Sequence, residues 1–139
     1  MNPSIIRALV AVCFGIALGP VCLLAQSPMR VTIPFDFNIG SNSFTAGDYT
    51  VKQDLQTSVV AIQSADNRSH MMTLTIGAQA GKAPEEGKLV FNRYGDQYFL
   101  SQVWTAGSAA GRRLLPSRAE KELIARASSK PVTLVASTK

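Results

Sequence analysis

Few side chains in this 139-residue sequence have the chemistry for a catalytic or metal site. His70 is the only histidine, and it lies in a turn-like segment directly before Met71. Both cysteines, Cys13 and Cys22, lie in an apolar segment near the N-terminus. A nucleophile needs a positioned base beside it, and zinc sites need several histidine, cysteine or carboxylate ligands. We therefore expect no metal, no cofactor and no histidine- or cysteine-based catalysis, and we interpret His70 as an exposed turn residue.

Carboxylates are the remaining candidates for acid–base chemistry. A glycosidase-like pair needs two carboxyl groups roughly 5–10 Å apart across a cleft, and no local spacing here imposes that geometry. Most acidic residues fall in predicted turns or at a predicted helix start, where they cap amides or are solvated. Asp36 differs, because it lies on the polar face of a predicted strand, from which a carboxylate can face a pocket. An enzyme based on carboxylates would therefore depend on Asp36.

Two groups of residues have the composition of binding surfaces. Arg93 and Tyr94, with Tyr98, form either a recognition patch or a structural hairpin in which Arg93 stacks across the strands on Tyr98, and we favour the structural interpretation. The most basic stretch either holds an anionic partner or is a solvated face that keeps the protein soluble. Its candidate residues are Arg112, Arg113, Arg118, Lys121 and Arg126.

The first 25 residues have the pattern of a secretory signal peptide. The segment Met1–Arg7 carries one positive charge, Ala8–Leu24 carries none, and the run ends at Ala25 before polar residues. This pattern predicts cleavage after Ala25 and export to the periplasm or the cell exterior. A retained anchor is the alternative, because an apolar run of about 17 residues is at the short limit for spanning a bilayer. Cleavage removes both cysteines, and contact with the membrane is expected only through the signal peptide.

Residues 26–139 are enough for one domain with its own apolar core. Apolar residues alternate with polar ones from Val31 to Ile39 and again from Phe44 to Gln53, which predicts strands. Pro34 cannot donate to a ladder, so the first strand should lie at a sheet edge or carry a bulge. Residues 57–63 and 71–76 should pair as a further hairpin across turn-forming residues.

The strongest local signal is a hairpin of residues 88–94 and 97–105 around Gly95-Asp96. Glycine at the first central position suits a type II′ turn, which predicts that Arg93 faces Tyr98, Phe91 faces Leu100 and Leu89 faces Gln102. In that register a core face carries four residues that alternate along the two strands. They are Leu89, Phe91, Leu100 and Trp104.

Ser117 and Glu120 form a capping box that predicts a helix over 117–127, with an apolar stripe of Ala119, Leu123 and Ala127 beside Ile124. Residues 107–111 are expected to be a loop, and residues 132–136 a last strand. The predicted fold is all-β and mainly antiparallel. We expect a β-sandwich or small barrel of about seven strands with one short C-terminal helix.

Four segments, in this order, resemble a group of uncharacterised small secreted β-rich proteins of acidobacteria. The resemblance implies export and a single β-rich domain with a C-terminal helix, and it implies neither an activity nor functional residues. The segments are Ile33–Phe37, Ala46–Val51, Val90–Leu100 and Ser117–Leu123.

The sequence has strong folding signals and few side chains suited to catalysis. We therefore expect an exported non-catalytic module that binds a partner or has a structural role in the cell envelope. Its partner would be an anionic envelope polymer or another envelope protein. Nucleic acid is not expected, because the basic stretch lacks interleaved aromatic residues for base stacking. The alternatives are a small barrel that binds an apolar ligand, and a carboxylate-dependent enzyme acting on envelope polysaccharide.

Overall fold

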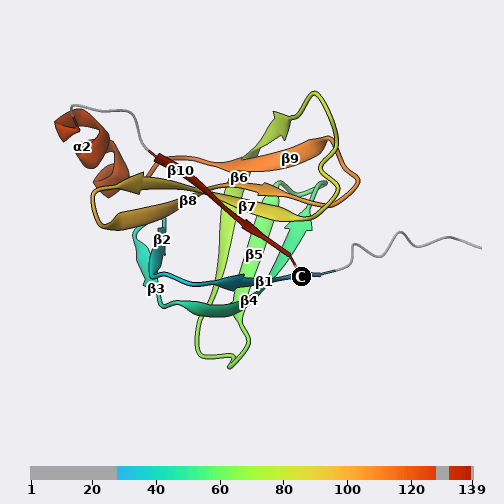
Figure 1. The fold of residues 1–139 in the computed structure, drawn as a ribbon, viewed down its shortest axis with the longest axis horizontal. Helices are drawn as coiled ribbons and strands as arrows, with labels where there is room; N and C mark the ends of the chain where they lie inside the picture. Colours follow the sequence, from blue (N-terminus) through green and yellow to red (C-terminus); the bar gives the residue numbers. More distant parts are fainter. Residues whose placement is uncertain (1–27, 128–131, 139) are drawn as a thin grey trace, which may run out of the picture.

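The computed structural model describes residues 28–127 and 132–138 (Figure 1). These residues form strands and one short helix, and the all-β prediction is confirmed. In chain order the elements are β1 (Met29–Ile33), β2 (Phe37–Ile39), β3 (Asn42–Phe44), β4 (Gly47–Asp54), β5 (Val59–Ser64), β6 (His70–Gln79), β7 (Lys88–Tyr94), β8 (Gln97–Trp104), β9 (Ala110–Leu114), α2 (Arg118–Arg126) and β10 (Val132–Ser137). The predicted signal peptide lies outside the described residues. The helix among them is too short to cross a bilayer.

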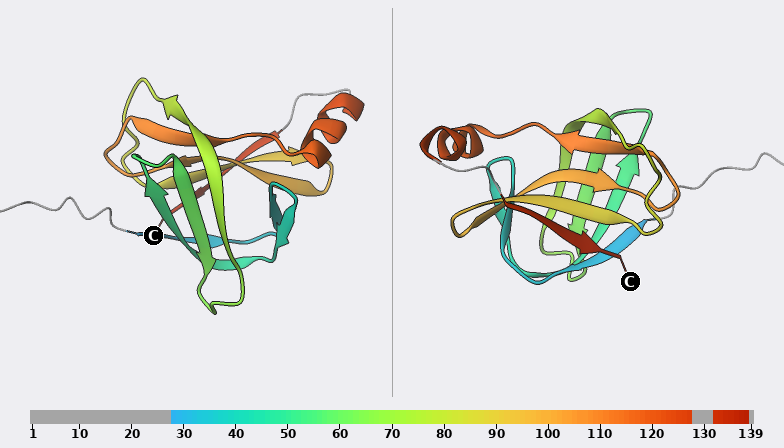
Figure 2. Two further views of the ribbon diagram at one scale, coloured as in Figure 1. Left: turned by 180° about the vertical axis from the view of Figure 1, so that it is seen from behind. Right: turned by 45° about the horizontal axis from the view of Figure 1, so that its top comes forward.

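The strands form one mixed sheet in the order β1-β4-β5-β6-β9-β8-β2-β3, with β7 paired to β8 and β10 paired to β7. Among the described pairings only β2–β8 is parallel. The sheet is bent, so that β1 and β4 lie across from β7, β8 and β9 (Figures 1 and 2). A single bridge joins Val31 of β1 to Thr138, directly after β10. The chain therefore brings its first and last described strands together.

The core lies inside this bend and is densely filled. Phe37, Phe91 and Ile39 are fully buried, and the Phe37 and Phe91 rings meet edge to face at 5.5 Å between centroids. Each fully buried side chain of this size stabilises the fold by about 1.5–3 kcal/mol relative to exposure. A cavity of about 100 Å³ remains at one end, between β4 and β8. This volume is below the roughly 300–1,000 Å³ of pockets for drug-sized ligands.

The first predicted strand is split in two at Pro34. β1 pairs with β4 as far as Ile33, whereas β2 pairs with β3 and β8. Proline has no N–H for a ladder, and the residues around it turn the chain from one side of the bent sheet to the other. The carboxylate of Asp36 accepts a hydrogen bond from the Ala46 amide at 2.8 Å, which closes this corner.

The β7–β8 hairpin follows the predicted register only near its turn. Gly95 has a φ of +61°, and Arg93 pairs with Tyr98 and Phe91 with Leu100, as predicted. A bulge then intervenes, so that Leu89 pairs with Val103 instead of Gln102. The extra residue reverses the alternation in β8. Val103 is therefore fully buried in the core, and the prediction that Trp104 shares this face is wrong.

The predicted helix and last strand are both present. Ser117 accepts a hydrogen bond from the Glu120 amide at 3.2 Å, and the helix starts at Arg118. The expected apolar stripe is not buried, since Ala119, Ile124 and Ala127 are exposed, and Glu120 is the buried residue of the helix. The expected loop over 107–111 is partly wrong, because β9 begins at Ala110 and pairs with both β6 and β8.

Candidate functional site

The strand β6 turns Met71, Thr73 and Thr75 inward and presents an apolar outer face. Its outward side chains Met72, Leu74 and Ile76 are 73%, 71% and 43% exposed. Between them, Thr75 is buried and its hydroxyl donates to the Ser58 carbonyl oxygen at 2.7 Å. Shifting the pairing register of a strand by one residue exchanges its two faces. The observed register of β6 therefore leaves in contact with water the apolar side chains that the shifted register would bury. β6 pairs with β5 through His70–Leu74 and with β9 through Thr75–Gln79, so among the described residues Met72 and Leu74 have a strand partner on one side only.

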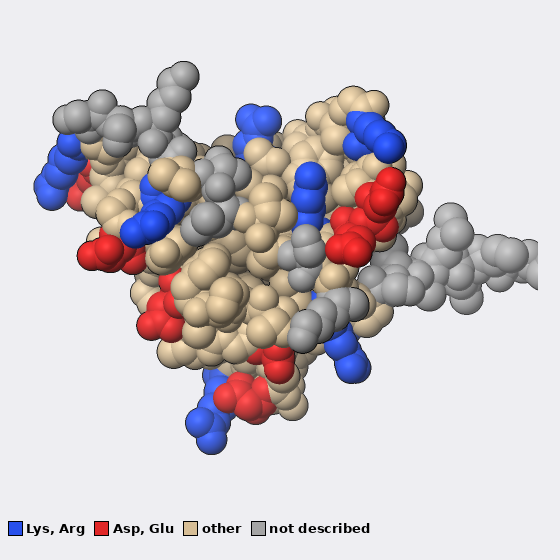
Figure 3. All heavy atoms as spheres, in the orientation of Figure 1, with Lys and Arg blue, Asp and Glu red and all other residues tan. Residues whose placement is uncertain are grey.

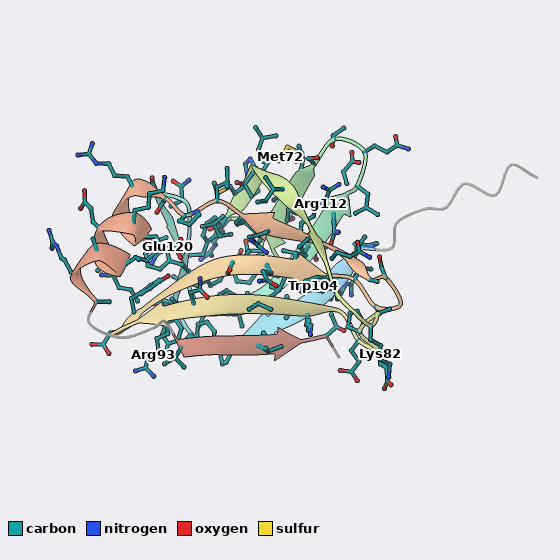
Figure 4. The ribbon with its side chains drawn as sticks, turned by 90° about the horizontal axis from the view of Figure 1, so that it is seen from above. Met72, Lys82, Arg93, Trp104, Arg112 and Glu120 are labelled. Atoms are coloured by element: carbon teal, nitrogen blue, oxygen red, sulfur yellow. The ribbon has the colours of Figure 1, made fainter. Side chains whose placement is uncertain are left out.

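Neighbouring strands extend this apolar area. Val59 lies opposite Leu74 and Ala61 lies opposite Met72 on β5, and both are half-buried. Cross-strand partners share one face of a sheet. We call these five residues the β6 strip: Val59, Ala61, Met72, Leu74 and Ile76. Figure 4 shows Met72 at the outer margin of the molecule.

Charged residues flank the β6 strip on both sides. Arg113 of β9 pairs with Ile76, and Lys52 of β4 pairs with Ala61, and both are exposed. Asp54 pairs with Val59, but its carboxylate accepts from the amides of Gln56 at 2.8 Å and Thr57 at 3.1 Å. Hydrogen bonds from the Thr57 side chain and these amides lower the pKa of Asp54. Since this carboxylate is already satisfied within its own turn, the flanks of the strip offer mainly positive charge.

The candidate residues of the basic stretch are not all on the surface. Arg112 is buried, because the alternation of β9 turns it inward while Arg113 points outward. Its guanidinium donates to the Leu55 carbonyl oxygen and, at 3.4 Å, to the Ser58 hydroxyl. Arg113, Arg118, Lys121 and Arg126 are exposed, and on the face seen in Figure 3 cations and anions are interspersed. Arg112 is therefore not available to an anionic partner in solvent.

The hairpin residues Arg93 and Tyr98 make the contact that the structural interpretation predicts. The Arg93 guanidinium lies 5.6 Å from the Tyr98 ring centroid, and its Nε donates to the Gly95 carbonyl oxygen at 2.7 Å. Tyr98 also stacks on Phe35, with 4.2 Å between centroids. Tyr94 lies on the opposite face of the hairpin, where it is buried and its hydroxyl meets Glu120. These three residues therefore do not form one recognition patch.

The residues considered for catalysis do not converge. Asp36 is exposed and bonded to a backbone amide, and His70 is exposed at the start of β6, opposite Gln63. Within residues 28–127 and 132–138 no three histidine, cysteine or acidic residues are grouped as metal ligands. The hypothesis of a carboxylate pair thus loses the pocket-facing Asp36 on which it depended.

The β6 strip was not identified from the sequence. Its signal was present, since Met72, Leu74 and Ile76 alternate with Thr73 and Thr75. Alternation alone does not reveal which face points outward, and the usual assumption places the apolar face inside. Comparisons of the chain with protein-family models, with curated proteins and with solved structures find no match.

Proposed function

We propose that this chain is an exported, non-catalytic binding module that docks on a partner protein of the cell envelope through the β6 strip. The observation that carries the proposal is the orientation of β6, which exposes Met72 and Leu74 by 73% and 71% while a threonine is buried on its inner face. Contiguous apolar surface of this kind marks interaction sites in soluble proteins. Interface centres are apolar with methionine enriched, and their rims are polar.

The charges beside the strip indicate which partner would fit. Arg113 and Lys52 flank it, and the whole chain has a formal net charge of +5. Like charges facing each other across an interface oppose binding, so a second copy is disfavoured. The complementary partner is a protein with an apolar patch bordered by acidic residues.

The proposal includes two further points: that the chain is exported, and that the bent sheet closes into a small barrel. Cleavage after Ala25 would release a chain beginning at Gln26. The bridge between Val31 and Thr138, and the hydrogen bond from the Thr138 amide to the Gly87 carbonyl oxygen at 2.9 Å, support a small barrel over a sandwich. The partner would dock on the outer face of the sheet, where Met72 and Leu74 are exposed.

Site-specific photo-crosslinking in the producing cell tests the proposal. A photoreactive residue replaces Leu74, and the matched control replaces Val135, an exposed apolar strand residue of β10. We expect one protein adduct from position 74 and none from 135, and loss of that adduct when Met72→Lys is added. Mass spectrometry of the adduct also reads the N-terminus, which should be Gln26.

Other outcomes overturn the proposal in distinguishable ways. An adduct with a second copy would make the strip a dimer interface, and adducts only with lipid would make it a membrane contact. Equal adducts from both positions would mean that the strip is not selective. Binding to an anionic polymer that depends on Arg113, Arg118, Lys121 and Arg126 but not on Leu74 would favour the alternative partner.

A further inference from the structure

The cavity at one end of the core has an unusual polar wall. It encloses about 100 Å³ and is lined by Met29, Val51, Leu55 and Val103 together with the polar residues Gln53, Thr105 and Ser108. Gln53 occupies a core position, because it follows Tyr49 and Val51 on the inner face of β4 and is only 8% exposed. An amide at such a position needs hydrogen-bond partners.

The hydrogen bonds around the cavity leave one donor free. The Thr105 hydroxyl donates to Gln53 Oε1 at 3.2 Å, and the Ser108 hydroxyl donates to the Ala110 carbonyl oxygen at 3.1 Å. Gln53 Nε2 has no acceptor among the described residues, and it is not among their fully buried unpaired atoms. The polar wall therefore offers N–H hydrogens to whatever occupies the cavity.

A buried positive charge lies behind the same wall. Arg112 is 7% exposed, pairs with Val103 across the strands and donates to the Leu55 carbonyl oxygen, so it adjoins two lining residues. Its Nε has no acceptor, and no carboxylate lies within 4.0 Å of it among the described residues. The charge of Arg112 reaches the exposed Asp54 carboxylate, which lies more than 4.0 Å away, so the buried guanidinium is only partly neutralised and favours a further anion nearby. Figure 4 shows Arg112 in the half of the molecule away from α2.

We infer that this cavity is a binding site for a short aliphatic carboxylate. A cavity of 150 Å³ holds a benzene molecule, so about 100 Å³ accommodates roughly four or five non-hydrogen atoms. The methyl and methylene groups would contact Met29, Val51 and Val103, while the carboxylate accepts from Gln53 Nε2 in the positive potential of Arg112. Leu55, which is 42% exposed, lies at the rim, where the ligand would enter. The site is on the inner side of the sheet and does not depend on the β6 strip.

Titration of the ¹⁵N-labelled protein with propionate tests this inference, with 1-propanol as the uncharged comparison. We expect saturable shifts of the Gln53 side-chain amide signal, and at least tenfold weaker binding of 1-propanol. In Gln53→Glu the new carboxylate repels the ligand, so propionate affinity should fall at least tenfold. Gln53→Leu, which suits an apolar core and should fold, should lose the same affinity if the Glu variant proves unstable.

The matched control is Gln63→Glu, on the outer face of the sheet, which should bind propionate as the wild type does. Absence of shifts at Gln53, equal affinity for propionate and 1-propanol, or unchanged binding in both Gln53 variants would overturn the inference. None of these results bears on crosslinking at Leu74, so the two proposals can fail independently.

Discussion

Trp104 shows how one inserted residue relocates a large side chain. The bulge before it turns the indole outward, where it covers Gly111 of the neighbouring strand and its Nε1 donates to Gln102 at 2.9 Å. A Cβ placed on Gly111 would overlap the indole ring of Trp104. Glycine is therefore required at position 111 by the close approach of the ring, and not by its backbone conformation.

Gly111→Ala should destabilise the protein by about 1–3 kcal/mol, because the indole must leave its position to admit the methyl group. Trp104 is the only tryptophan, so its fluorescence reports directly on the site, and we expect a red shift. The control is Gly77→Ala on the adjacent strand β6, where a Cβ meets nothing within 4 Å. Equal unfolding free energies for the two variants in urea titrations would contradict this explanation.

Among the elements, α2 is held to the sheet by a polar contact. Glu120 is 6% exposed, and its carboxylate accepts from the Tyr94 hydroxyl at 3.2 Å and from Asn92 at 3.5 Å. The predicted capping box forms only in part. Ser117 caps the helix by accepting from the Glu120 amide, whereas the Glu120 side chain is directed to β7. A nine-residue helix with exposed apolar residues has little else to fix it.

Glu120→Ala should lower stability by about 1–3 kcal/mol, because it leaves the buried Tyr94 hydroxyl without an acceptor. Glu122→Ala on the same helix removes only an exposed pair with Arg118 and should change stability little. Thermal unfolding of both variants, with amide exchange of residues 118–126, checks this. Similar losses in the two variants would show that helix propensity, and not the contact to β7, holds α2.

For the molecule as a whole, two buried tyrosines link global stability to pH. Burial raises the pKa of Tyr49 above 10.0, and burial with the nearby negative charge of Glu120 raises that of Tyr94. The folded state thus holds both phenols neutral at a pH where the unfolded chain releases their protons. Their contribution is complete below pH 10 and is lost as the pH rises further.

Melting temperatures should therefore change little from pH 7 to 9 and fall above pH 10. Each such tyrosine contributes up to about 1.4 kcal/mol of lost stability per pH unit between its unfolded and folded pKa. Tyr94→Phe should flatten this alkaline loss, although it costs the hydrogen bond to Glu120 at neutral pH. An unchanged alkaline slope in that variant would mean that other groups cause the loss.

The sequence by itself determined the elements whose signals are local. Period-two alternation indicated most strands, Gly95 defined the hairpin turn, and Ser117 defined the helix start, because each depends on residues only a few positions apart. The strand β9 was missed, since glycine and two arginines conceal its alternation.

Only the tertiary structure decided which face of each strand points inward. The bulge in β8 moved Trp104 out of the core, β9 turned Arg112 into it, and β6 exposed Leu74 while burying Thr75. These outcomes depend on register between strands that are distant in the chain, which no local pattern specifies. Both candidate sites, the β6 strip and the cavity beside Gln53, arise from these choices of face and were therefore beyond reach of the sequence alone.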